Sequence, residues 1–227
     1  MQFKALTTEE MRAAEQFGVE LGISKLCMME NAGASIARFL LDLVVSDPIL
    51  RTSKVRIVLL AGTGNNGGDV FVTARHLAFW NRNFQVSLFL VGEVENIRAE
   101  EAASNWNITK KCKSVRTSIL SSEERISDLT KELLSADVIV VGIFGTGFKG
   151  MPRLLQRRVI ESINAIEKAV IVSIDVPSGL DADTGSYDVA VVSDYTVTMH
   201  APKVGMLSES GRKICGGILV ANIGIPR

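Results

Sequence analysis

The 227-residue sequence has few cysteines and no excess of charge of either sign. Cys27, Cys112 and Cys215 are widely spaced and form no Cys-x-x-Cys pair, which argues against a disulfide framework or a zinc knuckle and favours a reducing, cytoplasmic setting. The 25 basic and 25 acidic residues cancel, so the charge excess typical of proteins that bind nucleic acid or anionic membranes is missing. We therefore expect small-molecule partners.

Long apolar runs are also missing. No run approaches the ~18 residues that a membrane span needs, and the first residues, MQFKALTTEEMRAAEQ, are polar where a secretory signal is apolar. The sequence has no internal repeat and no proline- or serine-rich linker, and 47% of its residues are hydrophobic, enough for a substantial core. We therefore expect one soluble domain over residues 1–227 with no membrane attachment.

Hydrophobic patterning predicts an α/β fold. Thr7 and Glu10 have capping-box spacing at the start of a helix that ends near Gly22, and a second helix runs from about Ser24 until Pro48 stops it. Short apolar runs predict strands at 55–61, 85–92, 136–144, 169–175 and 194–199, with helices at roughly 69–82, 97–111, 122–134 and 154–168. This alternation indicates a mostly parallel sheet with helices on both sides.

Four polar or glycine-rich loops directly follow predicted strands. They are GTGNNGGD, GTGFKG, DVPSGLDADTG and HAPKVG. Each taken alone is explained by turn chemistry, but the carboxyl ends of parallel strands share one sheet edge, so together the loops predict a crevice there. The side chains expected in it are Asn65, Asn66, Asp69, Asp175, Ser178, Asp181 and Lys203.

The first of these loops departs from the dinucleotide-binding pattern that it partly matches. Gly62, Gly64 and Gly67 have G-x-G-x-x-G spacing, but the second strand does not end in the acidic residue that usually accompanies it. Asp69, in the first turn of the predicted helix, stands where a pyrophosphate would bind, unless it serves only as the helix cap. The loop is therefore not predicted to hold an ordinary dinucleotide cofactor.

Asp175 is the strongest candidate for acid/base chemistry. It ends a buried strand shortly before Pro177, so its carboxylate is partly desolvated, which favours a raised pKa. Ser178 either caps the next helix or offers an oxygen to a cation. His76 is interpreted as a structural hydrogen-bond partner, and the role of His200 stays open. No serine or cysteine nucleophile motif accompanies them, which excludes triad hydrolysis.

The ordered motifs MMENAG, AGTGNNGGDVFVTARHL, IFGTGFKG, DVPSGLDADTG and DYTVTMHAPKVGM resemble the YjeF N-terminal domain family, whose best characterised members are NAD(P)H-hydrate epimerases. The resemblance runs from the first helix to NIGIP. It implies a three-layer, Rossmann-like α/β/α sandwich that forms a homodimer. It also implies a substrate, NADH or NADPH hydrated at C6, whose R and S forms are interconverted without a redox cofactor, with potassium nearby. The product would pass to a dehydratase.

The resemblance also implies roles for individual residues. Asp175 would be the catalytic acid/base, and Asn66 and Ser178 would bind potassium. The nucleotide would be contacted by Asn65, Asn66, Gly67, Gly68, Asp69 and Asp175, and its phosphates would be held by Gly145, Thr146, Gly147, Phe148, Lys149 and Gly150. Lys203, from the last crevice loop, completes the predicted substrate-binding set.

Two residues depart from the family pattern. Val141 stands where a potassium-binding aspartate is expected, so the cation site would be weak or lost, and Val70 replaces a glycine. A charge pair at about 4 Å and an effective dielectric near 20 contributes roughly 4 kcal/mol, or up to about three decades of affinity. The alternative function is therefore a catalytically silent module that binds nucleotide or protein. A dehydrogenase would need a second domain, for which the chain has no room.

Overall fold

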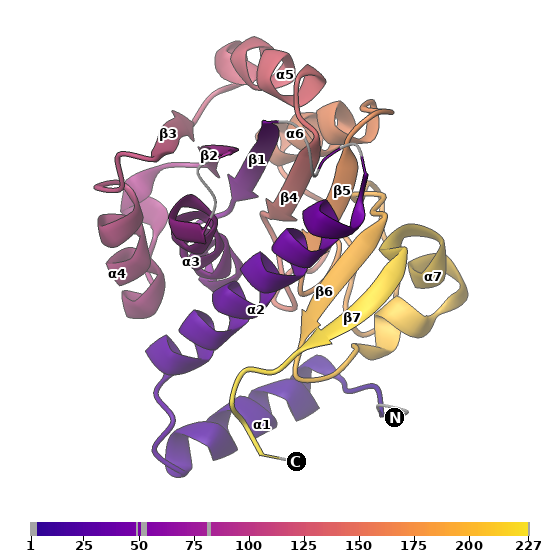
Figure 1. Ribbon diagram of the computed structural model, residues 1–227. Coiled ribbons are helices and arrows are strands. Elements are labelled where there is room, and N and C mark those ends of the chain that lie inside the picture. Colours follow the sequence, from indigo (N-terminus) through magenta and orange to yellow (C-terminus); the bar gives the residue numbers. More distant parts are fainter. Residues whose placement is uncertain (1–3, 49, 51–53, 81–82, 227) are drawn as a thin grey trace.

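The structure is a computed structural model that describes residues 4–48, 50, 54–80 and 83–226. Within these residues, seven strands form one sheet in the order β3-β2-β1-β4-β5-β6-β7, and all neighbours are parallel (Figure 1). The strands are β1 (Val55–Ala61), β2 (Phe84–Val91), β3 (Val115–Leu120), β4 (Val138–Gly142), β5 (Val170–Ile174), β6 (Tyr195–Met199) and β7 (Gly217–Ala221). The predicted parallel sheet is confirmed.

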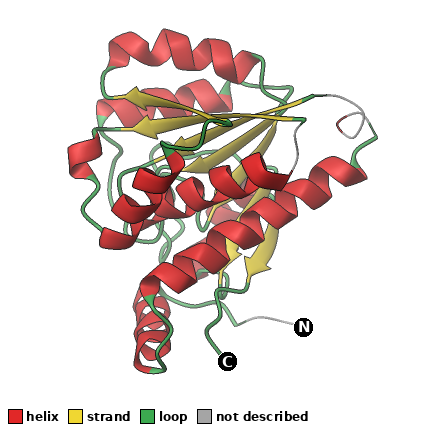
Figure 2. Cartoon of the chain, turned by 60° about the vertical axis from the view of Figure 1, so that its left-hand side comes forward, coloured by secondary structure: helices red, strands yellow, loops and turns green. Residues whose placement is uncertain are grey.

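Helices lie on both sides of the sheet, as Figure 2 shows, so the predicted three-layer α/β/α sandwich is confirmed. One apolar cluster joins the sheet to α2 (Lys25–Ser46), α3 (Asn65–Trp80) and α4 (Glu100–Thr109), and α1 (Thr8–Glu20) adds Met11 to it. A second cluster on the opposite face joins the sheet to α5 (Ile126–Leu134) and α6 (Leu154–Asn164). The structure also contains α7 (Glu209–Cys215) and the short 3-10 turns η2 (Val94–Asn96), η3 (Glu123–Arg125) and η4 (Val204–Leu207).

The first two helices begin where the sequence predicts. Thr7 Oγ1 accepts a hydrogen bond from the Glu10 amide at 3.1 Å, and Glu10 Oε2 accepts one from the Thr7 amide at 2.8 Å, which completes the capping box of α1. Ser24 Oγ likewise accepts from the Cys27 amide at 3.1 Å at the start of α2. α2 ends at Ser46, before Pro48.

The start of α3 corrects one expectation. α3 begins at Asn65 rather than at Asp69, and its first helical hydrogen bond runs from the Gly68 amide to the Gly64 carbonyl at 3.2 Å. The four residues assigned to a loop by their glycine and asparagine content are thus helical, because packing against neighbouring backbone overrides their weak helix propensity. Asp69 is therefore the fifth residue of the helix, too far along to cap it.

His76 has the structural role that its position in α3 predicts. Its Nε2 lies 2.8 Å from Glu30 Oε1, and Arg75 pairs with the other oxygen of the same carboxylate. These contacts tie α3 to α2.

Among the described residues, no helix combines the length and apolar character that crossing a membrane requires.

Candidate functional site

A cleft of about 620 Å³ opens at the carboxyl ends of β1, β4 and β5. The residues that follow these three strands line it, together with the first turns of α3 and one side of α1, which lies below this end of the sheet in Figure 1. Ligands of open parallel sheets bind at this edge. Three of the four loops that the sequence predicts to converge therefore border one cavity, the third of them through Asp175 alone. The fourth loop, HAPKVG, contributes no lining residue, and neither do Ser178, Asp181 and Lys203.

Glycines bring the first turn of α3 close to the sheet. A Cβ atom at Gly67 would lie 1.9 Å from the Gly62 carbonyl oxygen, and one at Gly62 would lie 2.0 Å from that of Ile143. Both contacts are shorter than any side chain tolerates. The amides of the first helical turn, from Asn65 onward, are thereby held at the cleft, where a helix N-terminus favours negative charge.

Asp175 ends β5 in a strained turn. Its φ is 63°, in the left-handed region that side chains other than glycine rarely adopt, and the Val176 amide donates to the Ile174 carbonyl across it at 2.8 Å. β6 ends in the same way at His200, with φ 61° and a bond of 2.6 Å from the Ala201 amide to the Met199 carbonyl. Such strain concentrates at functional sites, and here it turns the Asp175 carboxylate into the cleft.

A buried lysine holds the Asp175 carboxylate. The Lys203 side chain is 0% exposed, and its Nζ donates to Asp175 Oδ1, to Thr198 Oγ1 at 2.8 Å and to the Met199 carbonyl at 3.0 Å. All three ammonium protons thus have acceptors within the protein. Lys203 therefore orients and charge-balances Asp175 and has no proton left for a substrate.

Asn66 and Ser178 both bond the backbone of Phe144. Asn66 Nδ2 donates to the Phe144 carbonyl at 2.7 Å and to the Ile174 carbonyl at 3.1 Å, while Ser178 Oγ accepts from the Phe144 amide at 3.0 Å. Asn66 is 9% exposed, and no described residue donates a hydrogen bond to its Oδ1. A buried amide oxygen without a partner is costly in a folded protein and indicates a ligand at this position.

The loop at 145–150 lines the cleft with its first five residues and is held by ion pairs. Lys149 Nζ bonds Asp181 at 3.0 Å and Asp183 at 2.9 Å. Burial alone would raise the pKa of Asp183, but hydrogen bonds from the amide and hydroxyl of Thr8, each 2.7 Å, and from Lys149 lower that pKa to about 2. Phe144 and Phe148 stack with ring centroids 4.4 Å apart.

Two further carboxylates face the cleft with Asp175. Burial, followed by repulsion from Asp175 and Glu15, raises the pKa of Asp69 well above its usual value. Burial and the Asp175 charge also raise the pKa of Glu15. The site therefore combines one carboxylate neutralised by a lysine with two that resist ionisation.

Sequence reasoning missed several side chains that line the cleft. Three are on α1, namely Met11, Arg12 and Glu15, and another is Gln156 on α6, whose buried Oε1 accepts no hydrogen bond from a described residue. No motif marks them, because α1 reads as an ordinary amphipathic helix and reaches the cleft only through tertiary packing.

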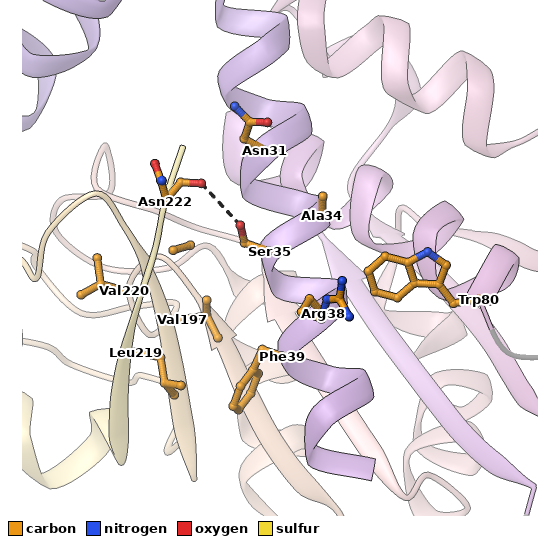
Figure 3. A pocket seen from close by; sticks show the side chains of 11 residues that line it. Asn31, Ala34, Ser35, Arg38, Phe39, Trp80, Val197, Leu219, Val220 and Asn222 are labelled. Carbon is orange, nitrogen blue, oxygen red and sulfur yellow. Dashed lines mark hydrogen bonds between the residues drawn. The ribbon is translucent and has the colours of Figure 1, made fainter. Parts of the chain in front are cut away.

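A second cavity of about 460 Å³ lies between α2 and strands β6 and β7 (Figure 3). Arg38, the one charged side chain among its described lining residues, lies over the Trp80 ring with 5.3 Å between its guanidinium carbon and the ring centroid. Phe39, Val197 and Leu219 are among its apolar lining residues, and Ser35 Oγ donates to the Asn222 carbonyl at 3.4 Å. With no carboxylate among the described residues that line it, this part of the structure lacks the acid/base groups of the cleft.

Comparison with known proteins gives the family. The model of the YjeF-related protein N-terminus matches residues 25–205. The chain belongs to this YjeF N-terminal family. The sequence resemblance stated above is confirmed.

Several similar proteins are named for activities on NAD(P)H hydrate. A Cenarchaeum symbiosum protein named NAD(P)H-hydrate epimerase is 38% identical over 97% of this chain and 95% of its own, and one from Nitrosopumilus maritimus is 36% identical with the same coverage. A Methanothermobacter thermautotrophicus bifunctional NAD(P)H-hydrate repair enzyme is 40% identical over 96% of this chain but only 40% of its own length. The crystal structure of yeast ynu0 matches with a TM-score of 0.76 at 26% identity, over 89% of this chain and 82% of that one.

Of the residues that the YjeF N-terminal resemblance implies for substrate binding, some line the cleft and others do not. The cleft is lined by Asn65, Asn66, Asp69, Gly145, Thr146, Gly147, Phe148, Lys149 and Asp175. Gly67 and Gly68 are buried in the packing of α3, where a Cβ at Gly68 would lie 2.5 Å from Met29 Cε. Gly150 is not among the lining residues, and Lys203 lies behind Asp175.

Val141 lies in the interior of the YjeF N-terminal sheet. Its side chain is fully buried in the apolar cluster beneath α5 and α6, in β4 between Leu60 and Ser173. It therefore supplies no polar ligand atom to the cleft. Val70, the other residue that departs from the family pattern, is also fully buried. It packs closely against Gly142, where an added Cβ atom would lie 2.5 Å from Val70 Cγ2.

Proposed function

We propose that this chain interconverts the R and S forms of NADH and NADPH hydrated at C6 of the nicotinamide ring. The observation that carries the proposal is Asp175, a carboxylate in a strained turn, held by the buried ammonium of Lys203 and facing the cleft. The names of the archaeal relatives support the choice of substrate. The chain would act as an isomerase in metabolite repair.

The chemistry requires acid/base groups but no redox cofactor and no covalent nucleophile. The C6 hydroxyl is next to the ring nitrogen, so its protonation and loss as water give an iminium ion, and water adds back to either face. Ring opening and reclosure would give the same result. Asp175 supplies the acid/base group, and the free amides at the start of α3 and the loop at 145–150 would receive the dinucleotide phosphates.

The experiment starts from hydrated NADH enriched in one C6 epimer. We expect the purified protein to equilibrate the epimers, as followed by reversed-phase chromatography, well above the spontaneous rate. Asp175→Asn, which keeps the shape of the side chain, should fold and lose about a hundredfold or more of the rate. A wild-type protein that leaves the epimers relaxing at the spontaneous rate would overturn the proposal.

A catalytically silent module, the alternative function, is not favoured by the site. Asp175 and the loop at 145–149 line one cavity, and Lys203 pairs with Asp175 from behind. Val141 alone departs from the expected polar pattern, and it is not placed to remove Asp175 from the cleft.

We further propose a weak potassium site at Asn66 and Ser178. Asn66 Oδ1 is buried without a donor, and amide and hydroxyl oxygens are ligands that hard cations prefer. When bound, the ion would supply positive charge to a cleft rich in carboxylates. Within the described residues no cluster of three acidic, histidine or cysteine side chains offers a stronger metal site.

Val141→Asp tests the weakness of this site without relying on activity. We expect thermal unfolding of the wild type to depend little on whether the salt is potassium or choline chloride. Val141→Asp should lose stability but regain part of it in potassium, whereas Ile139→Asp, on the same face of β4, should lose stability in both salts. Equal potassium dependence in all three proteins would contradict the assignment.

We also propose a homodimer that forms through β7. β7 is one of the two edge strands of the sheet, its Leu219 is 37% exposed, and the cavity of Figure 3 lies beside it. An open edge strand beside an apolar groove can pair with the same strand of a second copy about a twofold axis. Light scattering should give a dimer for the wild type and a monomer for Leu219→Lys. Val192→Lys, at an exposed apolar residue elsewhere, should stay dimeric.

Two further expectations, one about the cellular setting and one about the fate of the product, accompany this function. The three free cysteines, Cys27, Cys112 and Cys215, support a reducing cytoplasmic setting. The existence of longer bifunctional repair enzymes among the relatives supports the expectation that a dehydratase consumes the product epimer.

A further inference from the structure

Two carboxylates from different elements face the same cleft. Asp69 comes from α3 and Asp175 from the end of β5, and both line the cavity. Asn66 lies three residues before Asp69, on the same side of the helix, and its Nδ2 bonds the carbonyl of Ile174, the residue before Asp175. The face of α3 that carries Asp69 is therefore the face that meets the end of β5.

Independent observations indicate that a ligand occupies the space between these elements. Asn66 Oδ1 is buried without a donor on this face of α3, and Gln156 Oε1 is buried without one at the same cleft. Met199 lines both this cleft and a smaller cavity of about 110 Å³ that also reaches Asp69. Asp69 thus borders the cleft on one side and an adjoining recess on the other.

The two carboxylates have opposite environments. Asp175 is held by the Lys203 ammonium and by the Met199 amide and Thr198 hydroxyl, each at 3.4 Å. No described side chain donates a hydrogen bond to Asp69, and repulsion from Asp175 adds to the effect of its burial. When two carboxyl groups have such different surroundings, one can act as the acid and the other as the base.

The charges facing Asp69 come from every element around it. α1 contributes Arg12 and Glu15, α2 contributes Lys25, α4 contributes Glu101, and the strand ends contribute Asp175 and Lys203. Lys203 is engaged by Asp175, and Arg12 and Lys25 are exposed at the rim. The net effect of burial and of these charges is a raised pKa for Asp69.

We propose that Asp69 is a second catalytic residue, a protonated carboxyl that acts opposite Asp175 on the C6 carbinol. This inference rests on the proposed epimerase function. Asp69 gives its proton to the C6 hydroxyl oxygen, the C6–O bond breaks, water leaves, and the ring nitrogen lone pair forms the C6–N double bond. Water then adds to the other face of C6, the new C6–O bond forms, and Asp175 takes the proton that this water loses.

The step is balanced and reversible. One proton moves from Asp69 to the departing water, one moves from the arriving water to Asp175, and nothing is oxidised or reduced. In the reverse direction Asp175 is the acid and Asp69 the base. Each inversion therefore exchanges the C6 oxygen with solvent, whereas repeated turnover in one direction requires proton return through water in the cleft.

The test compares wild type with Asp69→Asn, and with Glu9→Gln on the exposed face of α1 as the control for loss of one negative charge. We expect Asp69→Asn to lose about a hundredfold of kcat with little change in KM. We expect the wild-type kcat to fall as pH rises through the raised pKa of Asp69, and this decline to vanish in the variant. Turnover in ¹⁸O water should label the C6 oxygen of every inverted molecule.

The outcomes separate the two proposals. A wild type that does not accelerate epimerisation overturns the proposed function and this inference with it. An active wild type with a flat alkaline profile, or an Asp69→Asn variant within threefold of the wild-type rate, overturns the role of Asp69 alone. Because Asn has nearly the shape of a protonated carboxyl and cannot ionise, Asp69→Asn should melt no lower than wild type. If it does melt lower, the wild-type pH profile decides the role of Asp69.

Discussion

At the residue scale, the ammonium of Lys203 shows how the site is held. It is fully buried, and Asp175 Oδ1, Thr198 Oγ1 and the Met199 carbonyl each accept one hydrogen bond from it. Lys203→Met should cost about 3–5 kcal/mol in the free energy of unfolding, because a buried carboxylate loses its counter-charge. Combining it with Asp175→Asn should recover much of that loss, since no unpaired charge remains.

Urea unfolding of the two single variants and the double variant measures this coupling. Lys213→Met is the matched control, because its lysine forms an exposed pair with Glu209 and such pairs contribute little. A double variant no more stable than Lys203→Met would show that the Lys203–Asp175 pair is not the reason for the loss.

Asp183 links α1 to the loop after β5, and its contribution depends on pH. Hydrogen bonds from Thr8 and Lys149 lower its pKa from 3.8 to about 2 in spite of burial. A lowered folded-state pKa stabilises the fold above the unfolded-state pKa and is lost as pH falls through the folded-state value. Relative to Asp183→Asn, the wild type should lose on the order of 1–2 kcal/mol between about pH 4 and about pH 2, as denaturant titrations at each pH would show. Parallel pH curves for the two proteins would contradict this assignment.

At the element scale, the close contact between β1 and α3 makes a prediction about two glycines of one motif. Gly67→Ala places a methyl group 1.9 Å from the Gly62 carbonyl, so we expect a loss of about 3 kcal/mol or failure to fold. Gly64→Ala, with no atom within 4 Å of the added Cβ, should change the free energy of unfolding by no more than about 0.5 kcal/mol. Equal unfolding midpoints for the two variants would disprove the contact.

The same elements show what sequence patterns can and cannot predict. Runs such as VRIVLLA and ADVIVVGIF lie in β1 and β4, which are buried on both faces, so continuous apolarity identifies them. β3 and β7 are the two edge strands; Arg116 and Ile119 are exposed in one, and Gly217 and Leu219 in the other. Edge strands need not be apolar on both faces, and the sequence pattern therefore does not predict them.

The candidate site likewise contains residues that sequence patterns predict and residues that they do not. Strand-end loops are local in sequence, so Asn66, Asp69 and Asp175 could be predicted to meet at one sheet edge. Arg12 and Gln156 reach the cleft only through the docking of α1 and α6, which no local pattern encodes. Lys203 was predicted to contact substrate because its loop is at the edge, whereas its burial beneath Asp175 depends on packing.

At the scale of the whole molecule, residues on both sides of the family match at 25–205 pack against the matched region. The Leu6 amide donates to the Pro202 carbonyl at 2.8 Å, and Leu6 forms a bridge with Lys203. Gly18 lies where a Cβ would be 2.5 Å from Met28 Cε and 3.1 Å from Ile225 Cγ1, so α1, α2 and the C-terminal segment meet.

A fragment of residues 25–205 is therefore expected to lack a cooperative unfolding transition. It loses Met11, Ala221, Ile223 and Ile225 from the main apolar cluster and exposes β6 as a new sheet edge. It also loses the Leu6 bridge beside Lys203, so Asp175 would be left with a partner that is no longer held in place. Circular dichroism during urea titration, with residues 4–226 as the control, measures the difference. If the fragment unfolded cooperatively at the control's midpoint, the ends would be dispensable for stability, and the environment of Asp175 would have to be encoded within the family core alone.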